Sequence, residues 1–144
     1  MPVTSRIGVA QDALLALLTA REALDGVAIA LGWPTPTPEP EQIWVAGDVS
    51  EWTSEWETND PEREERFTIP VKFLVQQSTI DYAEVRDRML ALVGELEQTV
   101  RANPDLTDSV WDAEIRGGEM SEYVFSDGRG LQATVNVLCR AHLQ

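Results

Sequence analysis

The sequence predicts an α+β fold: a largely antiparallel β-sheet packed against two amphipathic helices, in the order α-β-β-β-α-β-β with a long acidic loop. Apolar residues recur every three or four positions in 7–18 and 85–100, as on one face of a helix. They alternate with polar residues in 67–75 and 131–141, as in strands with one buried face. No repeat or linker interrupts the pattern, so we predict a single domain over 1–144, with the acidic loop at 47–65.

The N-terminal helix is expected to begin after a cap at Thr4 or Ser5. It should stop at Gly26, because glycine tolerates the left-handed conformation that often follows a helix. Two short apolar stretches, 27–31 and 42–46, are then predicted as strands on either side of a proline-rich turn. The apolar face of the helix would hold Ile7, Ala10, Leu14, Leu17 and Leu18.

The most biased stretch is 48–65, which holds eight carboxylates and one basic residue, Arg63, for a net charge of −7. It shows no core periodicity, which indicates a long exposed loop between two strands. Two interpretations stay open: a solvated loop without a partner, or an electrostatic role. Metal binding is disfavoured, because the stretch lacks the glycine and the spacing of a calcium loop. The acids are Asp48, Glu51, Glu55, Glu57, Asp60, Glu62, Glu64 and Glu65.

The strand at 67–75 carries Pro70 on its polar side, which indicates a free edge or a bulge there, because proline donates no backbone hydrogen bond. The second helix is predicted to start at Asp81, spaced from Glu84 as in a capping box, and to end at Asn103. Its apolar stripe consists of Val85, Met89, Leu92, Leu96 and Val100.

The C-terminal part predicts further strands. The strand at 111–116 is expected to end in a turn at Gly117 and Gly118. The segments 119–125 and 131–141 then favour a hairpin, since the residues between them have the composition of a turn.

Composition and missing motifs exclude several functions. The net charge of −14 disfavours tight binding of nucleic acid or of anionic membranes. No signal peptide and no stretch of roughly 20 apolar residues is visible, so folding in the cytoplasm is expected.

Cys139 falls on an apolar alternation and is expected to be buried, and His142 is expected to be exposed. With one cysteine, one histidine and no nucleophile, phosphate or dinucleotide motif, we expect no enzyme activity, no catalytic residue, no metal and no cofactor.

Three of the five tryptophans, Trp33, Trp52 and Trp56, lie in or beside predicted loops. A tryptophan in a polar loop either folds back on the core or anchors a partner, because tryptophan is enriched at interface hot spots. Three together favour an interface.

The order of motifs resembles the tail terminator (tail completion) proteins of long-tailed bacteriophages, part of the siphophage neck. The resemblance lies in an N-terminal helix, a Gly-Trp-Pro turn at 32–34, the strand segments 41–45 and 67–71, the helix start at 81–89, and the segment 101–106 before a closing hairpin. It covers nearly the whole chain, although the acidic insertion is longer than the family pattern.

The resemblance implies a structural protein of the virion tail, assembled in the host cytoplasm. It implies a homo-oligomer, a hexameric ring that caps the tail tube protein, ends its polymerisation and receives the head–tail connector or stopper protein, while DNA passes through without specific binding. The acidic loop would line the hole or reach a neighbouring subunit. The alternatives are a head–tail adaptor or stopper of the same neck, and a small cytoplasmic ligand-binding or regulatory module.

Overall fold

The computed structural model describes residues 5–33, 39–56, 63–79, 81–125 and 128–143. It confirms an α+β fold and adds one strand to the predicted order. The elements are α1 (Ile7–Thr19), a 3-10 turn η1 (Glu22–Leu24), β1 (Ala28–Leu31), β2 (Glu41–Val45), β3 (Ser50–Trp56), β4 (Arg63–Gln77), α2 (Tyr82–Ala102), β5 (Asp112–Phe125) and β6 (Gly128–Leu143).

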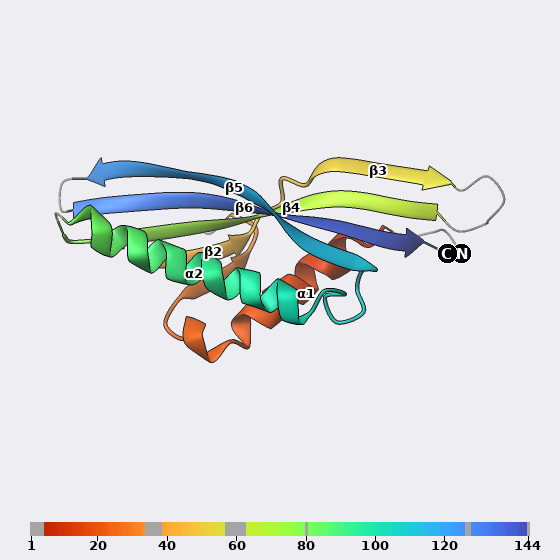
Figure 1. The fold of residues 1–144 in the computed structure, drawn as a ribbon, viewed down its shortest axis with the longest axis horizontal. Coiled ribbons are helices and arrows are strands. Elements are labelled where there is room, and N and C mark those ends of the chain that lie inside the picture. The colour runs from red at the N-terminus through yellow and green to blue at the C-terminus, as the bar shows by residue number, and fades with distance from the viewer. Residues whose placement is uncertain (1–4, 34–38, 57–62, 80, 126–127, 144) are drawn as a thin grey trace.

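The six strands form one sheet in the order β1-β2-β4-β6-β5, with β3 also paired to β4. Among the strand pairs of the described residues, only β1 and β2 run parallel, and the other pairs are antiparallel. The central ladder joins β4 to β6 along the whole of β4, from Arg63 opposite Leu143 to Gln77 opposite Arg129. In Figure 1, β3 lies beside one end of β4, while β5 and β6 extend to the opposite end of the long axis of the sheet.

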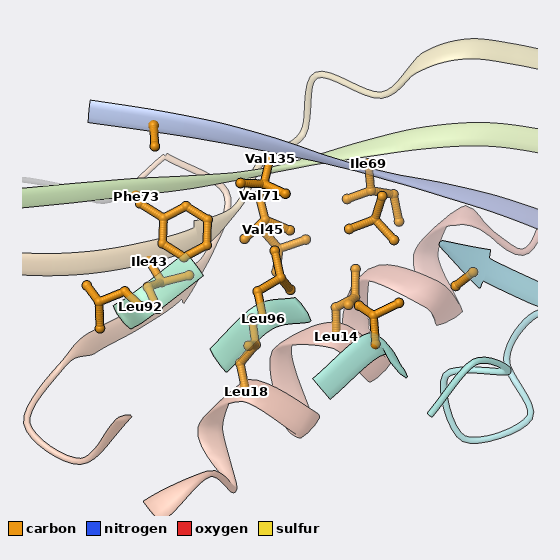
Figure 2. Close-up of a cluster of buried hydrophobic side chains, with 14 of the residues drawn as sticks. Leu14, Leu18, Ile43, Val45, Ile69, Val71, Phe73, Leu92, Leu96 and Val135 are labelled. Atoms are coloured by element: carbon orange, nitrogen blue, oxygen red, sulfur yellow. The ribbon is translucent and has the colours of Figure 1, made fainter. Parts of the chain in front are cut away.

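Both helices pack on the same face of the sheet, and the core lies between them and the strands (Figure 2). Helix α1 contributes Leu14 and Leu18, while Phe73 and Ile69 of β4 point toward the helices. The predicted stripe of α2 is confirmed, since all five of its apolar residues are buried. The other face of the sheet, called the open face below, carries a smaller buried cluster of Trp44, Ala46 and Leu74.

The helix starts agree only partly with their predicted caps. Asp81 caps α2 as predicted, since its Oδ1 accepts a hydrogen bond from the Ala83 N–H at 3.0 Å. At α1 the N-cap residue is Arg6, which makes no side-chain cap, but the Ser5 hydroxyl accepts a hydrogen bond from the Ile7 N–H at 3.2 Å. The predicted Ser5 cap is therefore confirmed one residue before the N-cap, and Thr4 lies outside the described residues. Helix α1 also ends at Thr19, well before Gly26, because the 3-10 turn η1 intervenes.

Pro70 lies where two strands meet the same edge of β4. On that edge β2 pairs up to Val71, and β3 begins opposite Thr68. The Pro70 carbonyl accepts a hydrogen bond from Ala46 on this side, so the missing proline N–H also faces the gap between the two strands. The predicted free edge is therefore found only as this short gap, since β4 is otherwise paired on both sides, and the proline removes no ladder hydrogen bond.

Gly117 and Gly118 form a bulge and not the predicted turn. The register of β5 against β6 shifts between Ile115 and Gly118, and the strand continues to Phe125. Gly117 has a φ of +82°, which glycine adopts without strain. A Cβ at Gly118 would lie 1.7 Å from the Thr134 backbone oxygen, so only glycine fits there.

Cys139 is fully buried among the core residues of β6, as the alternation predicts. Burial, with a smaller contribution from the negative charge of Asp112, raises the pKa of the thiol to about 12. The residue therefore behaves as a small apolar side chain with little thiolate at neutral pH.

Candidate interaction surfaces

The described parts of the acidic stretch include two paired strands, so the prediction of a loop across 47–65 is wrong for residues 50–56 and 63–65. Residues 50–56 form β3, which pairs with the start of β4: Thr53 lies opposite Arg66, and Glu55 opposite Glu64. We call β3 together with residues 63–68 the acidic hairpin. Glu57, Asp60 and Glu62 lie outside the described residues, and only the backbones of Glu55 and Trp56 are described.

Glu65 is the exception among these acids, because its side chain is only 1% exposed. One carboxylate oxygen accepts a hydrogen bond from the Arg6 backbone N–H at 2.8 Å, and the other accepts one from the Trp52 indole N–H at 2.9 Å. Arg6 is the N-cap of α1, so this carboxylate accepts the N–H of the N-cap residue and places negative charge at the N-terminus of the helix. Glu65 thus links the acidic hairpin to α1 and is not a solvent-facing acid.

The Arg6 side chain extends the same connection to the loop after α2. Its Nε donates to the Ser109 carbonyl oxygen at 2.9 Å, and its second guanidinium nitrogen donates to the Asp108 carbonyl oxygen at 3.3 Å. Three segments far apart in the sequence therefore meet at one residue.

The other described acids of the segment lie toward the open face, where each has a partner. Glu64 pairs with Arg66 at 3.0 Å, and Glu51 accepts a hydrogen bond from the Thr68 hydroxyl at 3.2 Å. Asp48 lies 3.8 Å from the Lys72 ammonium and is strongly exposed. Because these contacts are at the surface, each contributes little to stability and leaves the carboxylates accessible.

The tryptophans combine the two roles that the sequence leaves open. The side chain of Trp52 is 61% exposed, yet its indole N–H is held by Glu65. Trp33 is 73% exposed and packs edge-on against the buried Trp44, with ring centroids 5.5 Å apart. Each ring is anchored at one side and presents most of its apolar surface to solvent, a combination that suits recognition of a partner.

A further exposed aromatic pair was not predicted from the sequence. Trp111 is 59% exposed, and its ring lies edge-on to His142 with centroids 5.7 Å apart. The two residues are 31 positions apart, and β5 and β6 bring them together, so no local signal could have found the pair. His142 is exposed, as predicted.

Two kinds of feature are absent from the described part of the chain. No group of three or more His, Cys, Asp or Glu side chains among its residues could hold a metal ion. Its helices include none that is long and apolar enough to span a membrane. What the described surface offers is charged and aromatic contact area.

Among solved structures, a chain in the virion of a native gene transfer agent (GTA) particle has the same fold. The match has a TM-score of 0.51 and covers 91% of this chain and 94% of that chain, at 10% sequence identity. No protein-family model matches the sequence, and no curated protein does. At this identity the likeness establishes a shared fold over nearly the full length of both chains.

Proposed function

We propose that this chain is a structural protein of a phage-like virion, and specifically the tail terminator of a long-tailed phage. The observation that carries the proposal is the fold shared, over nearly the full length of both chains, with a chain of a gene transfer agent virion. The motif order that resembles tail terminators supports the same role. In the role of a tail terminator, copies of the chain form a hexameric ring on the last ring of the tail tube. This ring stops polymerisation of the tail tube protein and receives the head connector.

The distribution of charge and aromatic residues supports assembly without catalysis. A ring of this type needs two different patches on each copy, because each subunit contacts its neighbours head to tail. Trp33 lies beyond β1 at one edge of the sheet, while Trp52 lies in β3 and Trp111 directly precedes β5, so the exposed rings are not confined to one patch. The copies of the acidic hairpin would give a lumen along which DNA slides, since carboxylates repel phosphate.

Native mass spectrometry and negative-stain microscopy over a range of concentrations test the proposal. Rings with a central hole and a mass near six chains would support it, either alone or after addition of the tail tube protein of the same virus. A monomer that neither forms rings nor binds the tube would contradict it. A ring of different symmetry that binds the portal side would instead favour a head–tail adaptor or stopper.

The acidic hairpin has a separate test. Glu51, Glu55 and Glu64 would be changed to glutamine in the virus that encodes this chain, with Asp12→Asn in α1 as the matched control of an exposed acid elsewhere. We expect abnormal tail length, head joining or DNA ejection only in the hairpin variant. Normal tails and normal ejection would exclude an electrostatic role for these acids while leaving the ring proposal intact.

A further inference from the structure

The two outermost strands of the sheet, β1 and β5, lie on opposite sides of it, and each has a free edge. In the strand order β1-β2-β4-β6-β5, the described residues pair β1 only with β2 and β5 only with β6. The outer backbone N–H and C=O groups of both strands are therefore available to another chain. Each copy of the protein thus presents two different strand edges.

The edge of β1 is apolar and uncharged. The segment 27–33, with the sequence Val-Ala-Ile-Ala-Leu-Gly-Trp, contains no charged side chain and no proline. None of the four strand residues is buried, and Leu31 and Trp33 are 49% and 73% exposed. Natural proteins commonly protect such an edge by a charge, a proline or a bulge, whereas residues 28–31 pair with β2 without a register shift. This composition indicates that another chain covers the β1 edge.

The edge of β5 is apolar on the helix side of the sheet. Met120 lies opposite the core residue Ala133, and Val124, four residues further on, projects to the same side. Met120 and Val124 are 44% and 70% exposed. Met120 also lines a hollow of about 230 Å³ between β5 and α2, together with the exposed Leu90 of α2.

The apolar residues of the two edges occupy the same side of the sheet. Leu31 lies opposite the core residue Val45, so its side chain projects to the helix side, like that of Met120. If β1 of one copy paired with β5 of another, Leu31 would lie against Met120 and both side chains would lose exposed apolar surface.

The distribution of charge decides which edge of a second copy fits β5. Acidic residues lie around the β5 edge: Glu119 and Glu122 on the strand, and Glu97 on α2. A second β5 edge, or the β3 edge with Glu51, would bring like charges together, whereas the β1 edge brings none. The favoured contact is therefore head to tail, between two different edges, as a closed ring requires.

We propose that the β1 edge of one copy (residues 28–33) pairs with the β5 edge of a second copy (residues 118–125), with Leu31 beside Met120 and Leu90. Repeated from copy to copy, this contact joins the sheets of neighbouring subunits around the ring. The inference rests on the proposed ring and assigns the contact between its subunits.

Paired cysteine variants test which edges meet. In full-length protein with Cys139→Ala, one sample carries Leu31→Cys and another carries Met120→Cys. A short bismaleimide is added to each sample and to their mixture, with and without the tail tube protein of the same virus. We expect crosslinked dimers in the mixture and few in either sample alone. In the control, Val9→Cys, at an exposed apolar residue of α1, replaces Leu31→Cys and should give no crosslink with Met120→Cys.

A charge exchange gives a second, independent readout. Leu31→Lys alone and Met120→Glu alone should each weaken self-association about tenfold or more in sedimentation velocity, because each places an unpaired charge in an apolar contact. The double variant should recover association through an ion pair between copies. Since every copy carries a net charge of −14, wild-type association should be stronger at about 500 mM than at about 50 mM NaCl.

Crosslinking that is equally strong in the unmixed samples, or that is absent from the mixture, would overturn the inference. Rings that form while the mixture gives no crosslink would refute only this contact and leave the ring proposal standing. Absence of both rings and crosslinks would refute the two together. A double variant that associates no better than the single variants would also overturn the assigned contact.

Discussion

The substitution Glu65→Gln tests whether the buried carboxylate holds α1 and β3 together. Glutamine keeps the shape of the side chain but replaces one acceptor oxygen by an NH₂ donor. Both existing partners, the Arg6 N–H and the Trp52 indole N–H, are donors. Whichever orientation the amide takes, one donor then faces another donor inside the protein.

The expected cost follows from two contributions. A buried donor left without an acceptor costs about 1–3 kcal/mol. Loss of the negative charge at the N-terminus of α1 adds about 0.5–2 kcal/mol. We therefore expect the free energy of unfolding to fall by about 1.5–5 kcal/mol, and Tm to fall by about 5–20 °C for a chain of this size.

Urea denaturation followed by tryptophan fluorescence measures this change, and the double variant Glu65→Gln/Trp52→Phe isolates its cause. Phenylalanine removes the indole donor, so the introduced amide no longer faces it. The double variant should thus recover about 1 kcal/mol relative to the sum of the single changes. A Glu65→Gln protein within 0.5 kcal/mol of the wild type would refute the assigned geometry.

Three further substitutions test the packing of the sheet and of α2. Gly118→Ala should cost about 3 kcal/mol or more in denaturation experiments, because the added Cβ would lie 1.7 Å from the Thr134 carbonyl oxygen; an unchanged stability would contradict the bulge. Gly94→Ala in α2, where nothing lies within 4 Å of the added Cβ, should instead stabilise the protein by about 0.5–1 kcal/mol. Since burial raises the pKa of Cys139 to about 12, the folded state keeps the thiol proton that the unfolded chain loses above pH ~8.5. Stability should therefore decline between pH 8.5 and pH 12, by up to ~1.4 kcal/mol per pH unit from this group, and less so in Cys139→Ala; parallel pH profiles of the two proteins would exclude this linkage.

The sequence predicts those helices and strands whose buried residues recur with a regular period along one segment. The stripe of α2 and the alternation of β6 are correct because each buried face repeats along a single segment. Pro70 was informative because the chemistry of proline restricts where it fits in a sheet.

Elements that depend on distant partners could not be predicted in this way. Among the described residues β3 pairs only with β4, and its side chains 50–54 are exposed, so this strand has no buried face there to produce a period-two pattern. Glu65 is buried because Arg6, 59 positions earlier, and Trp52 supply donors to it. Gly117 and Gly118 have the composition of a turn, and only the register against β6 reveals a bulge.

The uninterrupted β4–β6 ladder has a mechanical consequence. At about 3.3 Å per residue, the 15 residues of β4 extend roughly 50 Å, from the acidic hairpin to the far end of the helix-covered body. β6 pairs with β4 over this whole distance, so the described residues contain no hinge between the acidic hairpin and the body. A force applied to the hairpin along the strand axis is therefore carried by the β4–β6 ladder. Glu65 would pass the same load to the first turn of α1. One continuous ladder of hydrogen bonds thus connects the charged end of the sheet directly to the core.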